Sequence, residues 1–192
     1  HGHSDKSSNL RFLDSTIKVD EMLDFARDNE YNAISFTGHE SLSDHISAER
    51  LYHSNKDYYN NFKLVLGNEI YLVHKSEMEN AEDNNLTSQD FKFSHFLLNA
   101  LDKKGHEFLQ KQSTLAWKHE HVYKGQDRVP SFYEDIENLM QDYKGHVIAS
   151  TACLGGKFAE LVLKIMKAND NEKAELQMKL SNYLDWCIKV FG

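Results

Sequence analysis

The chain has few of the residues that interrupt or cross-link a fold. Its 192 residues include one proline and two cysteines, Cys153 and Cys187. Two cysteines do not make the disulfide framework of a small extracellular domain, so we interpret both as free thiols. The apolar runs at residues 65–73 and 96–101 are broken by polar residues and are too short to cross a bilayer. With no signal peptide visible, we expect a cytoplasmic protein without a membrane segment.

Positive charge is also scarce. The chain has 22 Lys and Arg against 30 Asp and Glu, a formal net charge of −8. Such a balance repels a phosphate backbone, so the chain is not expected to hold DNA tightly by itself. Carboxylates gathered around metal ions would explain the excess of acid, and a solvated acidic surface would explain it equally well.

Helical and strand-like apolar periods alternate along the chain. This pattern predicts an α/β fold with a largely parallel sheet and functional side chains at the carboxyl ends of the strands. Ser41 is expected to cap the second helix. We expect strands over 32–37, 63–74, 94–100 and 146–151, helices over 19–29, 41–55, 103–120, 131–143, 157–169 and 172–191, and an exposed acidic loop over 76–90.

The most informative residues are potential metal ligands. His1 and His3 point to the same face if the segment is extended, and two imidazoles at this spacing can bind one ion. Such a pair is also common on surfaces and in purification sequences. Further candidate ligands lie where strands are expected to end, and these are Asp14, His39, Glu69, His95 and Cys153.

Five segments together resemble one family. They are HGHSDKSSNLRFLDS, FTGHESLSDH, LGNEIYLV, SHFLLNALDKKGHEFL and IASTACLGG, in that order between His1 and Gly156. The chain resembles the PHP (polymerase and histidinol phosphatase) domain at the N-terminus of bacterial and phage-type DNA polymerase III alpha subunits. This resemblance implies a distorted (β/α)7 barrel. Residues 1–192 would be a PHP domain fragment, incomplete at both ends, without the start of the first strand or the later DxH motif.

The resemblance also implies a ligand set for up to three divalent metal ions. His1 and His3 would hold the first ion, and Glu69 would bridge it to a second ion held with His95 and Cys153. A third ion would use His39 with Asp14. Of these seven residues, Glu69, His3 and His39 are the expected catalytic residues. Histidine and cysteine donors favour zinc or manganese, with magnesium as a further candidate.

Two departures from the family pattern weaken the expectation of activity. The family has aspartate before the second-motif histidine, whereas this chain reads Thr37-Gly38-His39. An aspartate at this position would orient the neighbouring histidine, so its absence predicts that His39 is poorly oriented. We therefore expect Gly38→Asp to tighten metal retention. No DxH tripeptide follows Gly156, and the chain starts at His1 without methionine. We therefore expect a fragment of a larger polymerase that has little phosphoesterase activity alone.

Three functions are compatible with these observations. The first is the PHP module of a DNA-directed DNA polymerase (a nucleotidyltransferase) in DNA replication, with phosphoesterase or 3′-5′ exonuclease chemistry. DNA would be met only through the parent enzyme, whose polymerising carboxylates lie in a palm domain elsewhere. The second is a degenerate docking module for the polymerase core or for a separate proofreading exonuclease. A small-molecule phosphatase of the histidinol phosphatase type is the third.

Other conspicuous residues receive structural interpretations. Helical spacing favours core packing, not base stacking, for Trp117 and Trp186. Gly155 and Gly156 are interpreted as a tight turn below Cys153 rather than a phosphate cradle. The histidines outside the matching positions are interpreted as surface or structural residues, and these are His45, His53, His74, His106, His119, His121 and His146.

Overall fold

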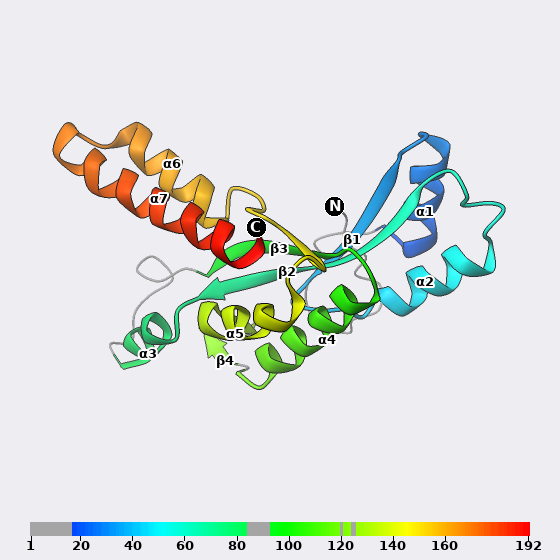
Figure 1. Ribbon diagram of the computed structural model, residues 1–192, viewed down its shortest axis with the longest axis horizontal. Helices are drawn as coiled ribbons and strands as arrows, with labels where there is room; N and C mark the ends of the chain where they lie inside the picture. The colour runs from blue at the N-terminus through cyan, green and yellow to red at the C-terminus, as the bar shows by residue number, and fades with distance from the viewer. Residues whose placement is uncertain (1–16, 84–92, 120, 124–125) are drawn as a thin grey trace.

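The computed structural model describes residues 17–83, 93–119, 121–123 and 126–192 (Figure 1). None of the helices in these ranges is long and apolar enough to cross a membrane. The helices are α1 (Val19–Asp28), α2 (His45–Ser54), α3 (Lys75–Asp83), α4 (Lys103–Trp117), α5 (Tyr133–Tyr143), α6 (Lys157–Lys167) and α7 (Asp170–Phe191). The strands are β1 (Ala33–His39), β2 (Lys63–Val73), β3 (Ser94–Ala100), β4 (His121–Tyr123), β5 (Gln126–Arg128), β6 (Pro130–Phe132) and β7 (Val147–Ser150).

The α/β class is confirmed, but the sheet is mixed rather than largely parallel. Its strands run in the order β1-β2-β3-β7, with β6 also paired to β2. The β1 and β6 pairings with β2 are parallel, whereas β2–β3 and β3–β7 are antiparallel. A parallel neighbour requires a crossover over the sheet. Helix α3 instead lies beyond the carboxyl end of β2, so β3 starts at that end and runs back (Figure 1).

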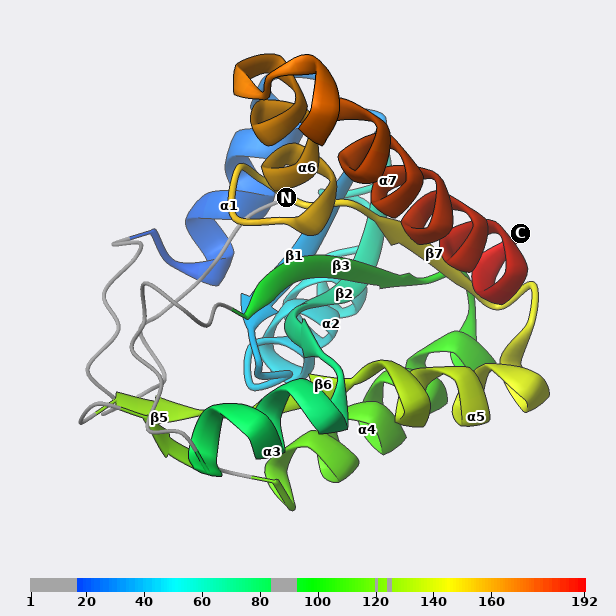
Figure 2. The same ribbon diagram turned by 90° about the vertical axis from the view of Figure 1, so that its left-hand side faces the viewer.

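Helices lie on both sides of the sheet. Helices α4 and α5 cover one face, the α6–α7 hairpin lies on the other side near β7, and α1 and α2 pack beside β1 and the start of β2 (Figures 1 and 2). Trp186 of α7 packs against Phe96 and Tyr133, which confirms its place in the core. Trp117 is 43% exposed, so the core prediction is wrong for that residue, which ends α4.

Two local predictions are corrected. Helix α2 begins at His45 with Asp44 as its N-cap, and Ser41 instead accepts a hydrogen bond from the Ser43 amide. The expected loop over 76–90 contains helix α3 at its start, because Met78 is buried against neighbouring apolar side chains. One apolar anchor is too little to give a helical period in the sequence. The three-residue strands β4, β5 and β6 were likewise too short to be predicted from alternation.

Burial of His45 makes the stability of the fold depend on pH. Its side chain is 2% exposed, and burial lowers its pKa from the ordinary value of 6.5 to about 4. As pH falls, the unfolded chain therefore binds this proton first, which favours unfolding. We expect metal-free protein to lose on the order of 3 kcal/mol of unfolding free energy between pH 6.5 and pH 4 from this group, the equivalent of its pKa shift.

Urea unfolding at a series of pH values in the presence of a chelator measures this effect. In His45→Gln the loss over the same pH interval should be smaller by that amount, whatever the variant's stability at neutral pH. Equal slopes for wild type and His45→Gln would contradict the prediction.

Candidate metal centre

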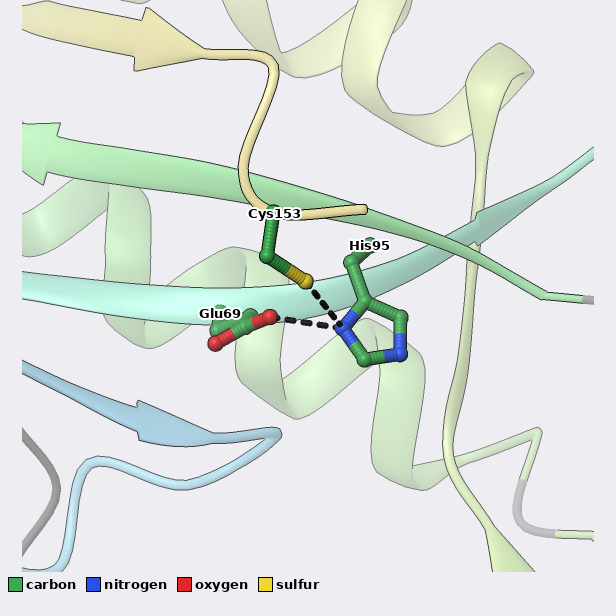
Figure 3. Close-up of side chains that lie close together, drawn as sticks. All are labelled: Glu69, His95 and Cys153. Atoms are coloured by element: carbon green, nitrogen blue, oxygen red, sulfur yellow. Dashed lines mark hydrogen bonds and ion pairs between the residues drawn. The ribbon is translucent and has the colours of Figure 1, made fainter. Parts of the chain in front are cut away.

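Three side chains from different parts of the chain meet at one end of the sheet (Figure 3). Glu69 lies within β2, His95 is the second residue of β3, and Cys153 lies in the turn after β7. The Nδ1 atom of His95 is 2.7 Å from Oε1 of Glu69 and 3.5 Å from Sγ of Cys153. One donor atom from each residue lies within 4.8 Å of the other two.

The antiparallel register brings these residues together. Glu69 is paired with Leu97, so His95 is its diagonal neighbour on the same face of the sheet. Strand β7 runs antiparallel to β3, and its carboxyl end therefore lies beside the start of β3, where Cys153 follows. The expectation that the candidate ligands lie where strands end is thus wrong for Glu69, which lies within β2. It is also wrong for His95, which reaches the same end of the sheet because β3 is reversed.

The turn after β7 fits closely around the imidazole. The backbone amide of His95 donates to the Gly155 carbonyl at 3.1 Å, and the Gly155 amide donates to the Cys153 sulfur at 3.4 Å. A Cβ atom on Gly155 would lie 3.1 Å from the His95 ring, which leaves little room for a side chain there. The Gly156 amide also donates to the Cys153 carbonyl at 3.0 Å, which supports the tight-turn interpretation.

The Glu69 carboxylate is 2% exposed and lies between two imidazoles. His95 approaches one oxygen, and His39 Nδ1 lies 3.7 Å from the other, Oε2. Tyr71, two residues further along β2 and therefore on the same face, places its hydroxyl 3.4 Å from His39 Nδ1 and packs its ring on His95. Tyr71 was not among the residues predicted from the sequence, although its spacing of two residues from Glu69 was a usable signal.

Glu40 holds the end of β1 next to His39. Its φ of 51° is left-handed, a strained conformation for a residue with a side chain. Its amide donates to the Glu69 carbonyl at 2.8 Å, its carbonyl accepts from Trp117 Nε1 at 3.1 Å, and its carboxylate accepts from the Val129 amide at 3.1 Å. Contacts from three segments thus keep the residue in this conformation. Nothing local in the sequence identified this role.

The donor set fits a divalent metal ion. An imidazole nitrogen, a carboxylate oxygen and a thiolate are the ligands that zinc prefers, at bond lengths of about 2.0 to 2.3 Å. Two donors bound to one such ion lie about 3 to 4 Å apart, and the spacings from His95 to Glu69 and Cys153 are close to that range. A buried carboxylate also needs a cation or donor nearby.

Of the remaining predicted ligands, His39 lies beside Glu69, whereas His1, His3 and Asp14 fall outside the described residues.

The chain is similar to a known family and to proteins named as DNA polymerases. A family model described as the PHP domain matches residues 1–192. The chain is 41% identical over 199 aligned positions to "Probable DNA polymerase YorL" of Bacillus subtilis (strain 168), covering 100% of this chain and 15% of that relative. A relative from Bacillus phage SPbeta, "DNA-directed DNA polymerase", has the same identity and coverage.

A more distant relative is "DNA polymerase III subunit alpha" of Aquifex aeolicus (strain VF5). It is 32% identical over 158 residues, which are 80% of this chain and 12% of that protein. The chain thus spans only about 15% of the length of the first two relatives. On the match over its whole length, the chain belongs to the PHP domain family.

Proposed function

We propose that this chain is the PHP module of a replicative DNA polymerase of the DNA polymerase III alpha type, with metal-dependent hydrolysis of phosphoesters as its own chemistry. The observation that carries the proposal is the convergence of Glu69, His95 and Cys153, with His39 on the second oxygen of Glu69. The names of the relatives support the polymerase parent. The function implies a cytoplasmic protein that meets DNA through the rest of the polymerase chain.

The residues of this end of the sheet have distinct parts in that chemistry. Glu69, His95 and Cys153 would hold one ion, and the second oxygen of Glu69 faces His39, as a carboxylate shared between two ions requires. Zinc or manganese is proposed, and the thiolate favours zinc. When bound, such ions polarise a phosphoryl group and lower the pKa of water. Cys153 is exposed, so a substrate can approach from its side.

The substrate we propose is the 3′ end of a DNA strand, with the parent acting as a 3′-5′ exonuclease. His1, His3 and Asp14 are proposed as additional ligands for up to three ions. We also propose that the mixed sheet belongs to the distorted (β/α)7 barrel implied by the family resemblance. Packing of α4 and α5 on one face of the sheet supports this architecture.

A docking role is favoured by a separate observation. Apolar side chains on the α6–α7 hairpin and the turn before it are widely exposed. They include Leu154 at 77%, Met166 at 75%, Met178 at 65% and Ile188 at 67% exposure. An apolar surface of this kind is typical of contacts between domains. The module could therefore support the polymerase core or a proofreading subunit in addition to, or in place of, catalysis.

The proposal is tested on the parent polymerase purified without chelator. We expect elemental analysis to find zinc or manganese bound at a stoichiometry of at least one ion per chain. We also expect the parent to release nucleotides from the 3′ end of single-stranded DNA. His95→Ala should abolish this release, because it removes the imidazole that lies next to both Glu69 and Cys153. Polymerisation should remain near wild type.

His74→Gln, which changes an exposed histidine outside the centre, serves as the matched control and should keep full nuclease activity. A parent with bound metal but no nuclease activity would leave the docking role as the function. Metal far below one ion per chain would contradict the metal centre itself.

A further inference from the structure

Tyr71 forms one wall of the centre around Glu69. Its side chain is 9% exposed and lies on the same face of β2 as Glu69, two residues further along the strand. On the neighbouring strand β3, His95 is its direct cross-strand partner, so the two side chains share that face. Tyr71 therefore lies beside the carboxylate on its own strand and beside an imidazole on the next strand.

The ring and the hydroxyl of Tyr71 contact different imidazoles. The ring centroid of Tyr71 lies 4.8 Å from that of His95, with 51° between the ring planes. Its hydroxyl lies 3.4 Å from Nδ1 of His39. A hydroxyl can donate or accept, so it can pair with this nitrogen in either tautomer of the imidazole. Because the two imidazoles approach different oxygens of Glu69, one side chain contacts both groups that flank the carboxylate.

Both imidazoles need neighbours that fix their orientation. The outer torsion of a histidine side chain has a broad distribution, so contacts with its surroundings determine the plane of the ring. The side chains of His39 and His95 are 21% and 28% exposed, and neither is enclosed on all sides. Removing a group that orients a metal-ligating imidazole typically costs about 10- to 100-fold in metal affinity.

We propose that Tyr71 is a positioning residue of the metal centre, whose hydroxyl orients His39 and whose ring orients His95. This inference rests on the proposed function, because it assigns both imidazoles to metal ions at Glu69. The hydroxyl acts on the ion on the His39 side, whereas the ring acts on the ion that His95 shares with Cys153. The two parts of one side chain therefore have separable effects.

Cobalt(II) titration of the 192-residue chain separates these effects. Cobalt bound to the Cys153 thiolate gives a charge-transfer band, whereas cobalt bound by nitrogen and oxygen alone gives only ligand-field absorption. Tyr71→Phe keeps the ring and removes the hydroxyl. It should weaken the binding without a charge-transfer band about tenfold and leave titration of the band unchanged. Tyr71→Leu also removes the aromatic ring, so it should weaken both kinds of binding by about tenfold or more.

Nuclear magnetic resonance of the imidazole nitrogens tests the positioning without metal. In metal-free protein, Tyr71→Phe should shift the ring-nitrogen resonances of His39 and leave those of His95 in place. Tyr71→Leu should shift both sets. Tyr52→Phe is the matched control, because it removes a tyrosine hydroxyl that donates to the Phe62 carbonyl at 2.7 Å, outside the centre. It should change neither the cobalt titration nor these resonances.

The two measurements distinguish failure of this proposal from failure of the proposed function. A wild-type chain that binds no cobalt would overturn the proposed function and with it any role of Tyr71 toward metal. If wild type binds cobalt and Tyr71→Phe matches it in titration and in the His39 resonances, only the role of Tyr71 is overturned. Equal weakening of both kinds of cobalt binding in Tyr71→Phe, or the same losses in Tyr52→Phe, would show general support of the fold and would also overturn it.

Discussion

Replacing Glu69 with alanine should remove most of the metal from the centre at the end of the sheet. Glu69 is the residue that contacts both imidazoles, with His95 2.7 Å from one oxygen and His39 3.7 Å from the other. In the proposed centre, its removal would delete a ligand and would leave two cations without the carboxylate between them. We therefore expect metal affinity to fall by at least about 100-fold, beyond what the loss of an outer-shell partner costs.

Titration with cobalt(II) measures this affinity. Cobalt bound to the Cys153 thiolate gives a charge-transfer absorption band, which a site without a thiol does not give. A thermal denaturation series with added zinc gives an independent measurement, because binding stabilises the folded state in proportion to the logarithm of ligand concentration. Glu69→Ala should lose the part of this stabilisation that depends on the centre. Without metal, the variant should be no less stable than wild type, since it no longer buries a carboxylate at 2% exposure.

Glu175→Ala is the matched control, because that carboxylate is 70% exposed on α7 and pairs across one helical turn with Lys179. It should bind metal as wild type does. An unchanged cobalt affinity in Glu69→Ala would remove Glu69 from the ligand set and with it the bridging role.

Gly38→Asp should destabilise the fold instead of repairing the metal site. The family pattern suggested that an aspartate at this position would orient His39. In β1, however, residues 38 and 39 point to opposite faces, and only His39 faces Glu69. A Cβ on Gly38 would lie 3.8 and 4.0 Å from the carboxylate oxygens of Asp44, which is 4% exposed.

A second carboxylate beside buried Asp44 is costly at neutral pH. Two like charges about 4 Å apart repel by about 4 kcal/mol at the effective dielectric constant of a protein site. We therefore expect Gly38→Asp to lower the unfolding free energy by up to that amount at pH 7, as measured by urea denaturation.

Gly38→Ala separates the effect of charge from that of size. Its methyl group would meet the Ser41 carbonyl at 3.1 Å, a tight contact that should cost less than the charge does. Two results would contradict this prediction. Gly38→Asp could be as stable as Gly38→Ala, or it could bind metal more tightly than wild type, and in either case the family's aspartate would be accommodated at this position. The repulsion that we expect from Asp44 would then be wrong.

The amino-acid sequence alone determined the α/β class and most of the helices. Helices α1, α4, α6 and α7 lie close to their predicted ranges because helical periodicity is a local property of ten or more consecutive residues. The residues proposed as ligands could also be identified from the sequence. His39, Glu69, His95 and Cys153 were identified by their place in short motifs, and the structure places all four at one end of the sheet.

The tertiary structure decided how these residues meet. Whether β3 runs parallel or antiparallel to β2 depends on where the connecting segment lies, which apolar alternation does not record. That direction places His95 diagonally across from Glu69. The Glu40 turn and the contact between His45 and His106 likewise depend on residues far apart in the sequence. Glu40 and Trp117, for example, are 77 positions apart. Such contacts are set by packing of whole elements, so no local pattern in the sequence encodes them.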